Sequence, residues 1–191
     1  MFSLVFKEES KRDACPERPA RSGSRKTCET TWWGDAWRRS VESASGEKTS
    51  SAASLLAAEG RIYGIGLSKG SVRAKAEGPH SEEYRVKIRF DRLRGVERRA
   101  LLSYVSDPYA SLALLSNELP ENCGRRIFKP LFGGFRPECT CSDGGTFCAH
   151  AAAVCLILSH EIDKAPQILF FLRGVRGEEL LSHIRGRGGK A

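Results

Sequence analysis

Three cysteines and one histidine lie within twelve residues of this chain, in the segment CTCSDGGTFCAH at residues 139–150. Their spacing is Cys139-x-Cys141, then six residues, then Cys148-x-His150. Three thiolates and one imidazole form a donor set that Zn²⁺ binds as a tetrahedron. The Ser-Asp-Gly-Gly between the two pairs gives the backbone the freedom that a turn needs. The pattern predicts a structural zinc knuckle that runs into a helix, CAHAAAVCLILSH.

Other uses of clustered cysteines fit this spacing less well. Haem attachment needs Cys-x-x-Cys-His and thioredoxin-like redox chemistry needs Cys-x-x-Cys, and neither pattern occurs. Iron–sulfur clusters usually take four thiolates. A loop of reactive thiols remains as the alternative reading. Four protein ligands leave no open position for water, so we expect one structural Zn²⁺ and no catalysis at the metal.

The rest of the composition narrows the class of protein. No apolar stretch approaches the ~20 residues of a membrane span, and the apolar run in MFSLVFKEES is too short for a signal peptide. We therefore expect the reducing cytoplasm, where clustered cysteines more often bind metal than form disulfides. No nucleophile–base pair or paired carboxylates stand out. We expect no enzyme activity, no small-molecule substrate and no membrane partner.

We divide the chain into four ranges. Residues 1–28 are predicted to be a disordered basic arm, and residues 186–191 a flexible tail. Residues 29–120 are predicted to form an α+β region with a three-stranded sheet. Residues 121–185 would hold the zinc finger and the C-terminal helices. The expected fold class is α+β, with a small antiparallel sheet and several helices.

Two helices are marked by their start signals. Thr31 can cap a helix in which Trp33, Trp37 and Val41 share one face. Asp107 caps a second helix with Pro108 in its first position. The segments around these helices are predicted to be irregular: SASGEKTSSAAS at 43–54 as a loop and NCGRRIFKPLFGGFRPE at 122–138 as an extended connection. The inner face of the second helix is expected to carry Tyr109, Leu112 and Leu115 or Ser116.

Three segments are predicted to be strands: RIYGIGLS, SVRAKAEG and EYRVKIRF, of which the second and third alternate with the period of a strand. In the last, apolar side chains face one way and basic side chains the other, which predicts a sheet with one buried and one basic face. Residues 61–99 carry a net charge of +6, most of the chain's +8. Such a face is either simply solvated or a surface for an anionic partner such as DNA. The candidate nucleic-acid-binding residues are Arg73, Lys75, Arg85, Lys87 and Arg89.

Several segments together resemble the prokaryotic SWIM zinc finger proteins: TWWGDAW, GRIYGIG, SNELP, CAHAAAVCLIL and FFLRGVRGEELL, in that order. The resemblance implies that the zinc ligands are Cys139, Cys141, Cys148 and His150. Such proteins often have lysine just before the ligand histidine and Pro-Asp after the second cysteine. Here Ala149 and Ser142-Asp143 stand instead, which removes one positive charge beside the site.

The resemblance implies two functions. SWIM domains are proposed to bind DNA or protein partners, and free-standing members are often encoded near a Swi/Snf-class ATPase. This chain has no Gly-x-x-x-x-Gly-Lys-Ser/Thr phosphate loop, so it cannot itself be that ATPase. Our first hypothesis is a non-catalytic DNA-binding module, accessory to a Swi/Snf-class helicase-like ATPase. The alternative is a protein–protein interaction adaptor in which zinc is purely structural and DNA is not bound.

Overall fold

A computed structural model of the chain describes residues 30–78, 80–120, 129–141 and 147–185. The predicted arm at 1–28 and the predicted tail at 186–191 lie outside these residues. The described part is α+β, as predicted, and contains seven α-helices, one 3₁₀ turn and one antiparallel sheet of four strands. The helices are α1 (Trp32–Ser45), α2 (Glu47–Ala58), α3 (Gly95–Val105), α4 (Pro108–Leu115), α6 (Ala149–Lys164), α7 (Gln167–Leu172) and α8 (Gly177–Arg185).

The sheet has the strand order β1-β2-β3-β4. The three predicted strands are confirmed as β1 (Ile62–Ser68), β2 (Ser71–Glu77) and β3 (Glu83–Phe90). The fourth, β4 (Phe135–Cys139), was not predicted as a strand and lies within the segment expected to be an extended connection. It pairs with β3 from Phe90 opposite Phe135 to Val86 opposite Cys139. This pairing brings the start of the cysteine motif into the sheet.

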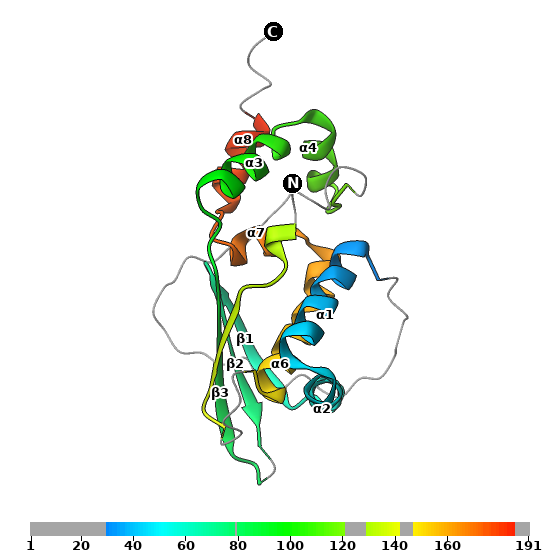
Figure 1. Cartoon of the computed structure of the whole chain (residues 1–191), viewed down its shortest axis with the longest axis vertical. Helices are drawn as coiled ribbons and strands as arrows, with labels where there is room; N and C mark the ends of the chain where they lie inside the picture. Colours follow the sequence, from blue (N-terminus) through cyan, green and yellow to red (C-terminus); the bar gives the residue numbers. More distant parts are fainter. Residues whose placement is uncertain (1–29, 79, 121–128, 142–146, 186–191) are drawn as a thin grey trace.

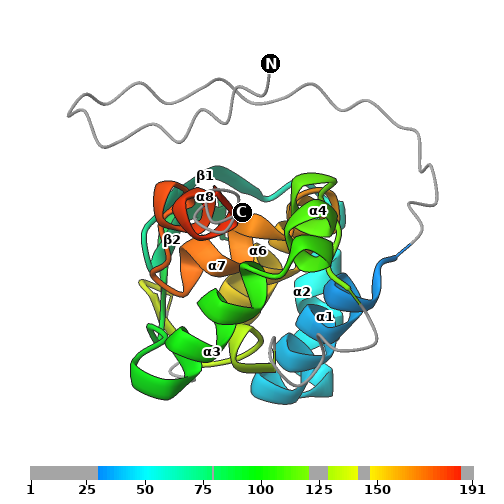
Figure 2. The ribbon, with the colours of Figure 1, turned by 90° about the horizontal axis from the view of Figure 1, so that it is seen from above.

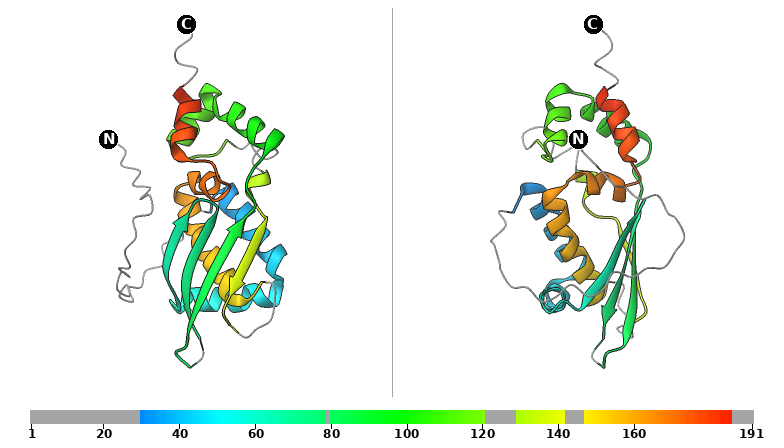
Figure 3. Two further views of the ribbon diagram at one scale, coloured as in Figure 1. Left: turned by 90° about the vertical axis from the view of Figure 1, so that its left-hand side faces the viewer. Right: turned by 180° about the vertical axis from the view of Figure 1, so that it is seen from behind.

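Helices cover only one face of the sheet. Helix α6 packs on that face and is itself covered by α1 and α2 (Figures 1 and 3). Side chains of β2 and β3 alternate accordingly, with Val72, Val86 and Ile88 buried beneath α6. None of the described helices or strands covers the other face, which carries the basic residues (Figure 3).

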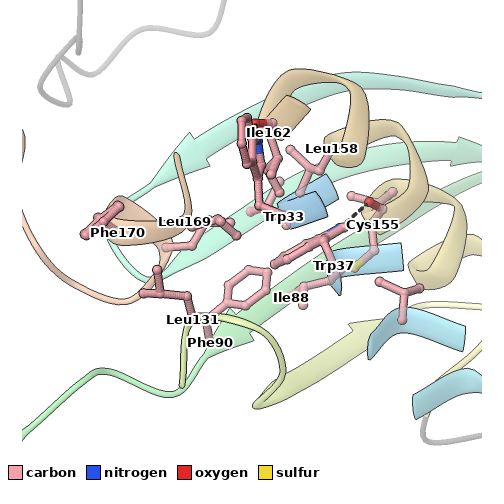
Figure 4. Packing of buried hydrophobic residues seen from close by; sticks show 14 of the residues in the cluster. Trp33, Trp37, Ile88, Phe90, Leu131, Cys155, Leu158, Ile162, Leu169 and Phe170 are labelled. Atoms are coloured by element: carbon pink, nitrogen blue, oxygen red, sulfur yellow. Dashed lines mark hydrogen bonds between the residues drawn. The ribbon is translucent and has the colours of Figure 1, made fainter. Parts of the chain in front are cut away.

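Two tryptophans attach α1 to α6. The indole nitrogen of Trp37 donates a hydrogen bond to the carbonyl of Cys155 at 2.8 Å, and that of Trp33 donates to Ile162 at 3.0 Å (Figure 4). Trp37 is fully buried and its ring contacts Phe90 at the end of β3. The indoles therefore contribute apolar area and also satisfy their own donors inside the core. The predicted aromatic face of this helix is confirmed as a core feature.

A buried carboxylate fixes the start of α1. Asp163, in the last turn of α6, accepts hydrogen bonds from the backbone nitrogen and the hydroxyl of Thr31. It also forms a salt bridge with Arg38 at 3.0 Å, although its own side chain is only 4% exposed. Thr31 in turn caps α1 by accepting from the nitrogen of Gly34. A β-carbon on Gly34 would stand 1.8 Å from the Asp163 carboxylate. Only glycine leaves room for this ion pair.

Helices α3, α4 and α8 form a separate group at one end of the sheet (Figures 1 and 2). Arg98 of α3 joins α8 because one of its guanidinium nitrogens donates to both carboxylate oxygens of Glu179, at 2.6 Å each. Below this group, the buried Arg173 donates hydrogen bonds to the carbonyls of Leu131 and Asp91. One guanidinium thus links the end of α7, the 3₁₀ turn at Lys129–Leu131 and the end of β3.

Two local predictions were wrong. Most of the expected loop at 43–54 is helical, because α2 begins directly after Gly46. The hydroxyls of Ser51 and Ser54 bond back to carbonyls of their own helix, at 3.1 and 3.0 Å, so these residues do not break it. Packing of α2 against α6, centred on the buried Ala53, overrides the low helix propensity of this sequence.

The orientation predicted for α4 was also wrong. Its expected inner face is exposed, with Tyr109 at 71%, Leu112 at 66% and Leu115 at 49%. The buried side consists of Ala110, Ser111 and Leu114. The hydroxyl of Ser111 donates to the carbonyl of Val105 at 2.7 Å, which holds this side inward. Because the helix is apolar on nearly all sides, its periodicity did not define which face is buried. The predicted cap, Asp107, and Pro108 at the first position are confirmed.

Gly34→Ala should destabilise the protein by about 1–3 kcal/mol, the usual cost of overpacking a core. The new methyl group would displace a carboxylate that three hydrogen bonds hold in place. Urea denaturation measures the change. Gly66→Ala is the control, because nothing lies within 4 Å of its β-carbon position, and it should change stability by no more than about 0.5 kcal/mol. Equal effects of the two substitutions would contradict this account of Gly34.

Candidate metal centre and basic sheet face

The four predicted ligand residues come together in the structure. Cys139 ends β4, Cys141 follows it by two residues, Cys148 precedes α6, and His150 lies in the first turn of that helix. Their donor atoms all lie within 4.8 Å of one another. A zinc tetrahedron with bonds of about 2.3 Å needs sulfur atoms about 3.8 Å apart. Small side-chain movements would reach that spacing, so the cluster is consistent with one structural Zn²⁺.

The sheet positions the first pair of cysteines. The ladder between β3 and β4 continues one residue past Cys139, where the nitrogen of Thr140 donates to the carbonyl of Arg85 at 3.2 Å. The nitrogen of Arg85 then donates to the Thr140 side-chain oxygen at 2.9 Å. A side chain has replaced the backbone acceptor here, and the chain bends at Cys141. The strand pairing ends where the cluster begins. Residues 142–146, which include the predicted Ser-Asp-Gly-Gly turn, lie outside the described residues.

The second pair of ligands enters from the start of α6. Cys148 is the N-cap residue and is buried. A hydrogen bond from the Cys139 thiol is the main reason that the pKa of Cys148 is lowered to about 5, and a backbone hydrogen bond from Ala151 adds to the effect. The same pairing raises the pKa of Cys139 well above its usual value. A thiolate forms most readily at the helix N-terminus, where the helix dipole favours negative charge.

His150 provides the test of whether this cluster suits a metal. It is buried against the ring of Tyr84, with ring centroids 5.1 Å apart. Its Nδ1 atom is buried and has no hydrogen-bond partner among the described residues. An orphaned polar atom in the interior costs free energy unless something occupies its lone pair or takes its proton. A zinc ion held by the three thiolates would fill that role, so the donor set fits the metal.

Cys155 lies outside the cluster. It sits two turns further along α6, is fully buried, and burial raises the pKa of its thiol. This agrees with its prediction as a small core residue. Among the described cysteines, it is the one that the four-residue cluster does not include.

The five predicted basic residues share the outer face of the sheet. Arg73 pairs with Lys87 across β2 and β3, and Lys75 pairs with Arg85. Directly opposite residues of antiparallel strands point to the same side, so these cations form a grid and not a single row. Arg89 continues the grid one step further along β3. All five are exposed or half-buried.

Ion pairs neutralise part of this grid. Lys75 contacts Glu83 at 3.1 Å, and Arg89 contacts Glu138 at 3.0 Å. Hydrogen bonds from Lys75 first, and then from Tyr63, lower the pKa of Glu83. Within the described ranges neither Arg85 nor Lys87 has a carboxylate at salt-bridge distance. These two cations are therefore the best placed to meet an external anion.

Sequence reasoning missed two members of this face. Arg136 lies opposite Arg89 because β4 joins the sheet, which the extended-connection prediction did not foresee. Tyr63 lies opposite Lys75, so an aromatic ring shares the face with the cations. A one-residue bulge in β1 after Tyr63 shifts the register and hides this alternation in the sequence. Strand pairing identifies both residues as members of this face. Local periodicity in the sequence does not show which residues of two strands lie opposite each other.

The geometry described above is that of a Cys₃His site of the structural type. Residues 125–158 match the SWIM zinc finger family, and this range contains all four clustered residues. The match confirms the predicted SWIM-type zinc finger; the resemblance of the segments outside that range stays a prediction. Neither a search of curated proteins nor a search of solved structures found a match.

A SWIM zinc finger is a binding module, generally non-catalytic, that mediates nucleic-acid or protein interactions. Among the described helices, none is both long enough and apolar enough to cross a membrane.

Proposed function

We propose that this chain is a non-catalytic SWIM-type DNA-binding module in which Cys139, Cys141, Cys148 and His150 hold one structural Zn²⁺. The unpartnered Nδ1 of His150 and the proximity of the four donors support this ligand set. The ion would tie the end of β4 to the start of α6. Because all four positions are filled by protein, the metal would shape the binding module and take no part in a reaction.

The one-sided basic face of the sheet is the observation that carries DNA binding. Helices cover the inner face, while Arg73, Arg85 and Lys87 stand on the open one. Four strands about 4.8 Å apart span about 14 Å, more than the ~12 Å width of the major groove. The face would therefore rest on phosphates and not read base edges. Such binding depends on salt and tolerates many sequences.

The remaining parts of the proposal concern context. A module that binds DNA without a phosphate loop suits an accessory of a Swi/Snf-class helicase-like ATPase. It is not itself an enzyme in this proposal. The cytoplasmic location inferred from cysteine usage is part of the same proposal.

Freshly purified protein should contain one zinc ion per chain by elemental analysis. Cys148→Ser should lose the ion and lower the melting temperature, because it removes a buried ligand at the junction of β4 and α6. Zinc binding worth about 10–16 kcal/mol in small zinc-finger peptides appears there as folding free energy. Chelation of the wild-type protein should have the same effect.

Cys155→Ala is the matched control for the metal experiment. It removes a buried thiol from the same helix, and should keep the zinc while losing some stability to the cavity. Unchanged zinc content and melting in Cys148→Ser would make the cysteines a loop of reactive thiols instead.

DNA affinity, measured by fluorescence anisotropy with a labelled duplex, should fall steeply as salt rises. Lys87→Glu should weaken binding and reduce the slope of log K against log salt by about 1, the loss of one phosphate contact. Arg85→Glu should behave alike, because it also has no carboxylate partner in the described part of the chain.

Lys48→Glu makes the same charge change on α2, in the helical layer away from the basic face. If the face is the binding surface, this control should bind with nearly the wild-type slope. Equal losses in Lys48→Glu and Lys87→Glu would mean that only net charge matters and that the face has no special role.

A specific observation also favours the adaptor function. The exposed side of α4, formed by Tyr109, Leu112 and Leu115, is an apolar stripe on the helix group at the end of the sheet. Clustered exposed apolar residues mark protein–protein contact sites. A Swi/Snf-class ATPase would be the partner under this second function.

The stripe can be tested separately from the basic face. Leu112→Asp should abolish co-purification of a Swi/Snf-class ATPase, identified by mass spectrometry, while Lys87→Glu should leave it intact. The stripe variant should also keep the wild-type melting temperature, because Leu112 is largely exposed. Loss of self-association in Leu112→Asp, seen by sedimentation, would instead assign the stripe to a second copy of the chain.

A further inference from the structure

Three connections meet at the end of the sheet nearest α3 and α8. They are the turn at Lys69–Gly70 between β1 and β2, the linker at 91–94 after β3, and residues 173–176 between α7 and α8. Backbone hydrogen bonds fix them: the nitrogen of Gly70 donates to the carbonyl of Phe171 in the last turn of α7 at 3.3 Å, and that of Leu93 donates to the carbonyl of Arg173 at 3.0 Å. The three connections therefore hold fixed positions relative to one another.

The side chain of Arg92 lies across this junction. A β-carbon on Gly174 would stand 3.1 Å from its Cγ atom, and one on Gly70 would stand 3.5 Å from its Nε atom. Both glycines have φ of +83°, a conformation that other residues rarely adopt. Because neither glycine has a side chain, the aliphatic part of Arg92 packs directly on the backbone at both positions. Its guanidinium is thereby directed by the fold, although the residue is exposed.

Two other cations lie on the connections that Arg92 crosses: Lys69 directly precedes Gly70, and Arg176 follows Gly174 by two residues. Partial burial first, and then the guanidiniums of Arg176, Arg92 and Arg98, lower the pKa of Lys69. The neighbouring carboxylate, Glu179, is engaged by Arg98 through both oxygens. In the described ranges of the chain, Lys69, Arg92 and Arg176 have no carboxylate at salt-bridge distance. Because Glu179 is already engaged by Arg98, like charges near one another here favour the binding of an anion among them.

We propose that Lys69, Arg92 and Arg176 form a phosphate-binding site at this junction, and that its ligand is a backbone phosphate of the bound nucleic acid. The identity of the ligand rests on the proposed function, whereas the site itself does not. Guanidiniums and ammoniums pair with phosphate oxygens through charge-assisted hydrogen bonds. Nothing in this geometry reads a base.

The site lies at one end of the strands that carry the basic face. The row Ser71–Arg89–Arg136 crosses the sheet immediately beside the Lys69–Gly70 turn. The opposite end of the same strands, around the β2–β3 hairpin, carries Glu77, Glu82 and Glu83. At the junction end, Asp91 is the one acid among residues 89–94 and pairs with Arg136 at 2.7 Å, so unpaired cations remain there, whereas the hairpin end is richer in carboxylates. A nucleic acid on this face would run toward the junction and away from the hairpin.

The test compares two doubly neutralised full-length proteins. Lys69→Gln/Arg176→Gln removes two cations of the site and leaves the packed stem of Arg92 in place. Lys48→Gln/Arg99→Gln removes one lysine and one arginine from the exposed faces of α2 and α3. Binding of a labelled duplex is measured across a salt series, and melting is measured with and without inorganic phosphate.

The site variant should bind DNA more weakly, with a salt slope reduced by about 2, while the control keeps a nearly wild-type slope. Phosphate should raise the melting temperature of the wild type and of the control more than that of the site variant. Without phosphate, the site variant should melt no lower than the wild type, because removal of two positive charges relieves repulsion between like charges.

The remaining outcomes separate this inference from the proposed function. DNA binding that Lys87→Glu weakens and the site variant leaves unchanged would overturn the phosphate site and leave the basic face standing. No DNA binding by the wild type, together with phosphate protection lost in the site variant, would support the site with free phosphate as its ligand. Equal responses of both double variants in both assays would overturn the inference.

Discussion

The burial of α6 is the constraint on which the rest of this fold depends. Ten of its sixteen residues are buried, and the sheet, α1 and α2 all pack against it. Consecutive alanines at 151–153 let those elements approach closely. Its N-terminus presents Cys148 and His150 to the metal cluster, while its last turn presents Asp163 to Thr31 and Arg38. One helix thus joins the Cys₃His cluster at one end to an ion pair at the other, with two tryptophan hydrogen bonds between them.

Strand β4 connects the cluster to the candidate binding face. Its residues alternate, so that Arg136 and Glu138 lie on the outer face while Cys139 faces the cluster. Glu138 also pairs with Arg89 on that face. Anything that orders Cys139 therefore orders the edge of the basic grid as well. In the proposed function, a zinc ion would support DNA binding in this way without touching a phosphate, which suits the uncharged Ala149 beside His150.

The sequence predicts this fold best where a local pattern and its tertiary role agree. The cap at Thr31, the alternation of β3 and the metal spacing all satisfy that condition, and all were recognised in advance. Helix α2 was missed because Ser, Thr and Gly favour loops locally, whereas its stability comes from packing on α6. The exposed side of α4 was misassigned because a short helix that is apolar all round has no distinct periodicity. Strand β4 was missed because Pro137 and two nearby glycines mask an edge strand that depends on a partner 49 residues earlier, as in the Arg89–Glu138 contact.

The distribution of charge follows the same division between local and tertiary information. Strand alternation alone places Arg73, Lys75, Arg85, Lys87 and Arg89 on one face, which the sequence shows. The junction cations cannot be found in this way, because Lys69, Arg92 and Arg176 lie on three connections separated by more than twenty residues each. Only the fold brings them together, and it does so through glycines at 70 and 174 that accept a backbone conformation closed to most residues.

Where a fold uses two constrained glycines to support an unpaired arginine, stability alone gives no reason for the arrangement, since repulsion works against it. An anion that binds only to the folded state would make the arrangement stabilising, because its binding free energy adds to the free energy of unfolding. The acidic hairpin at the far end of the same strands then sets the direction in which such an anion would extend.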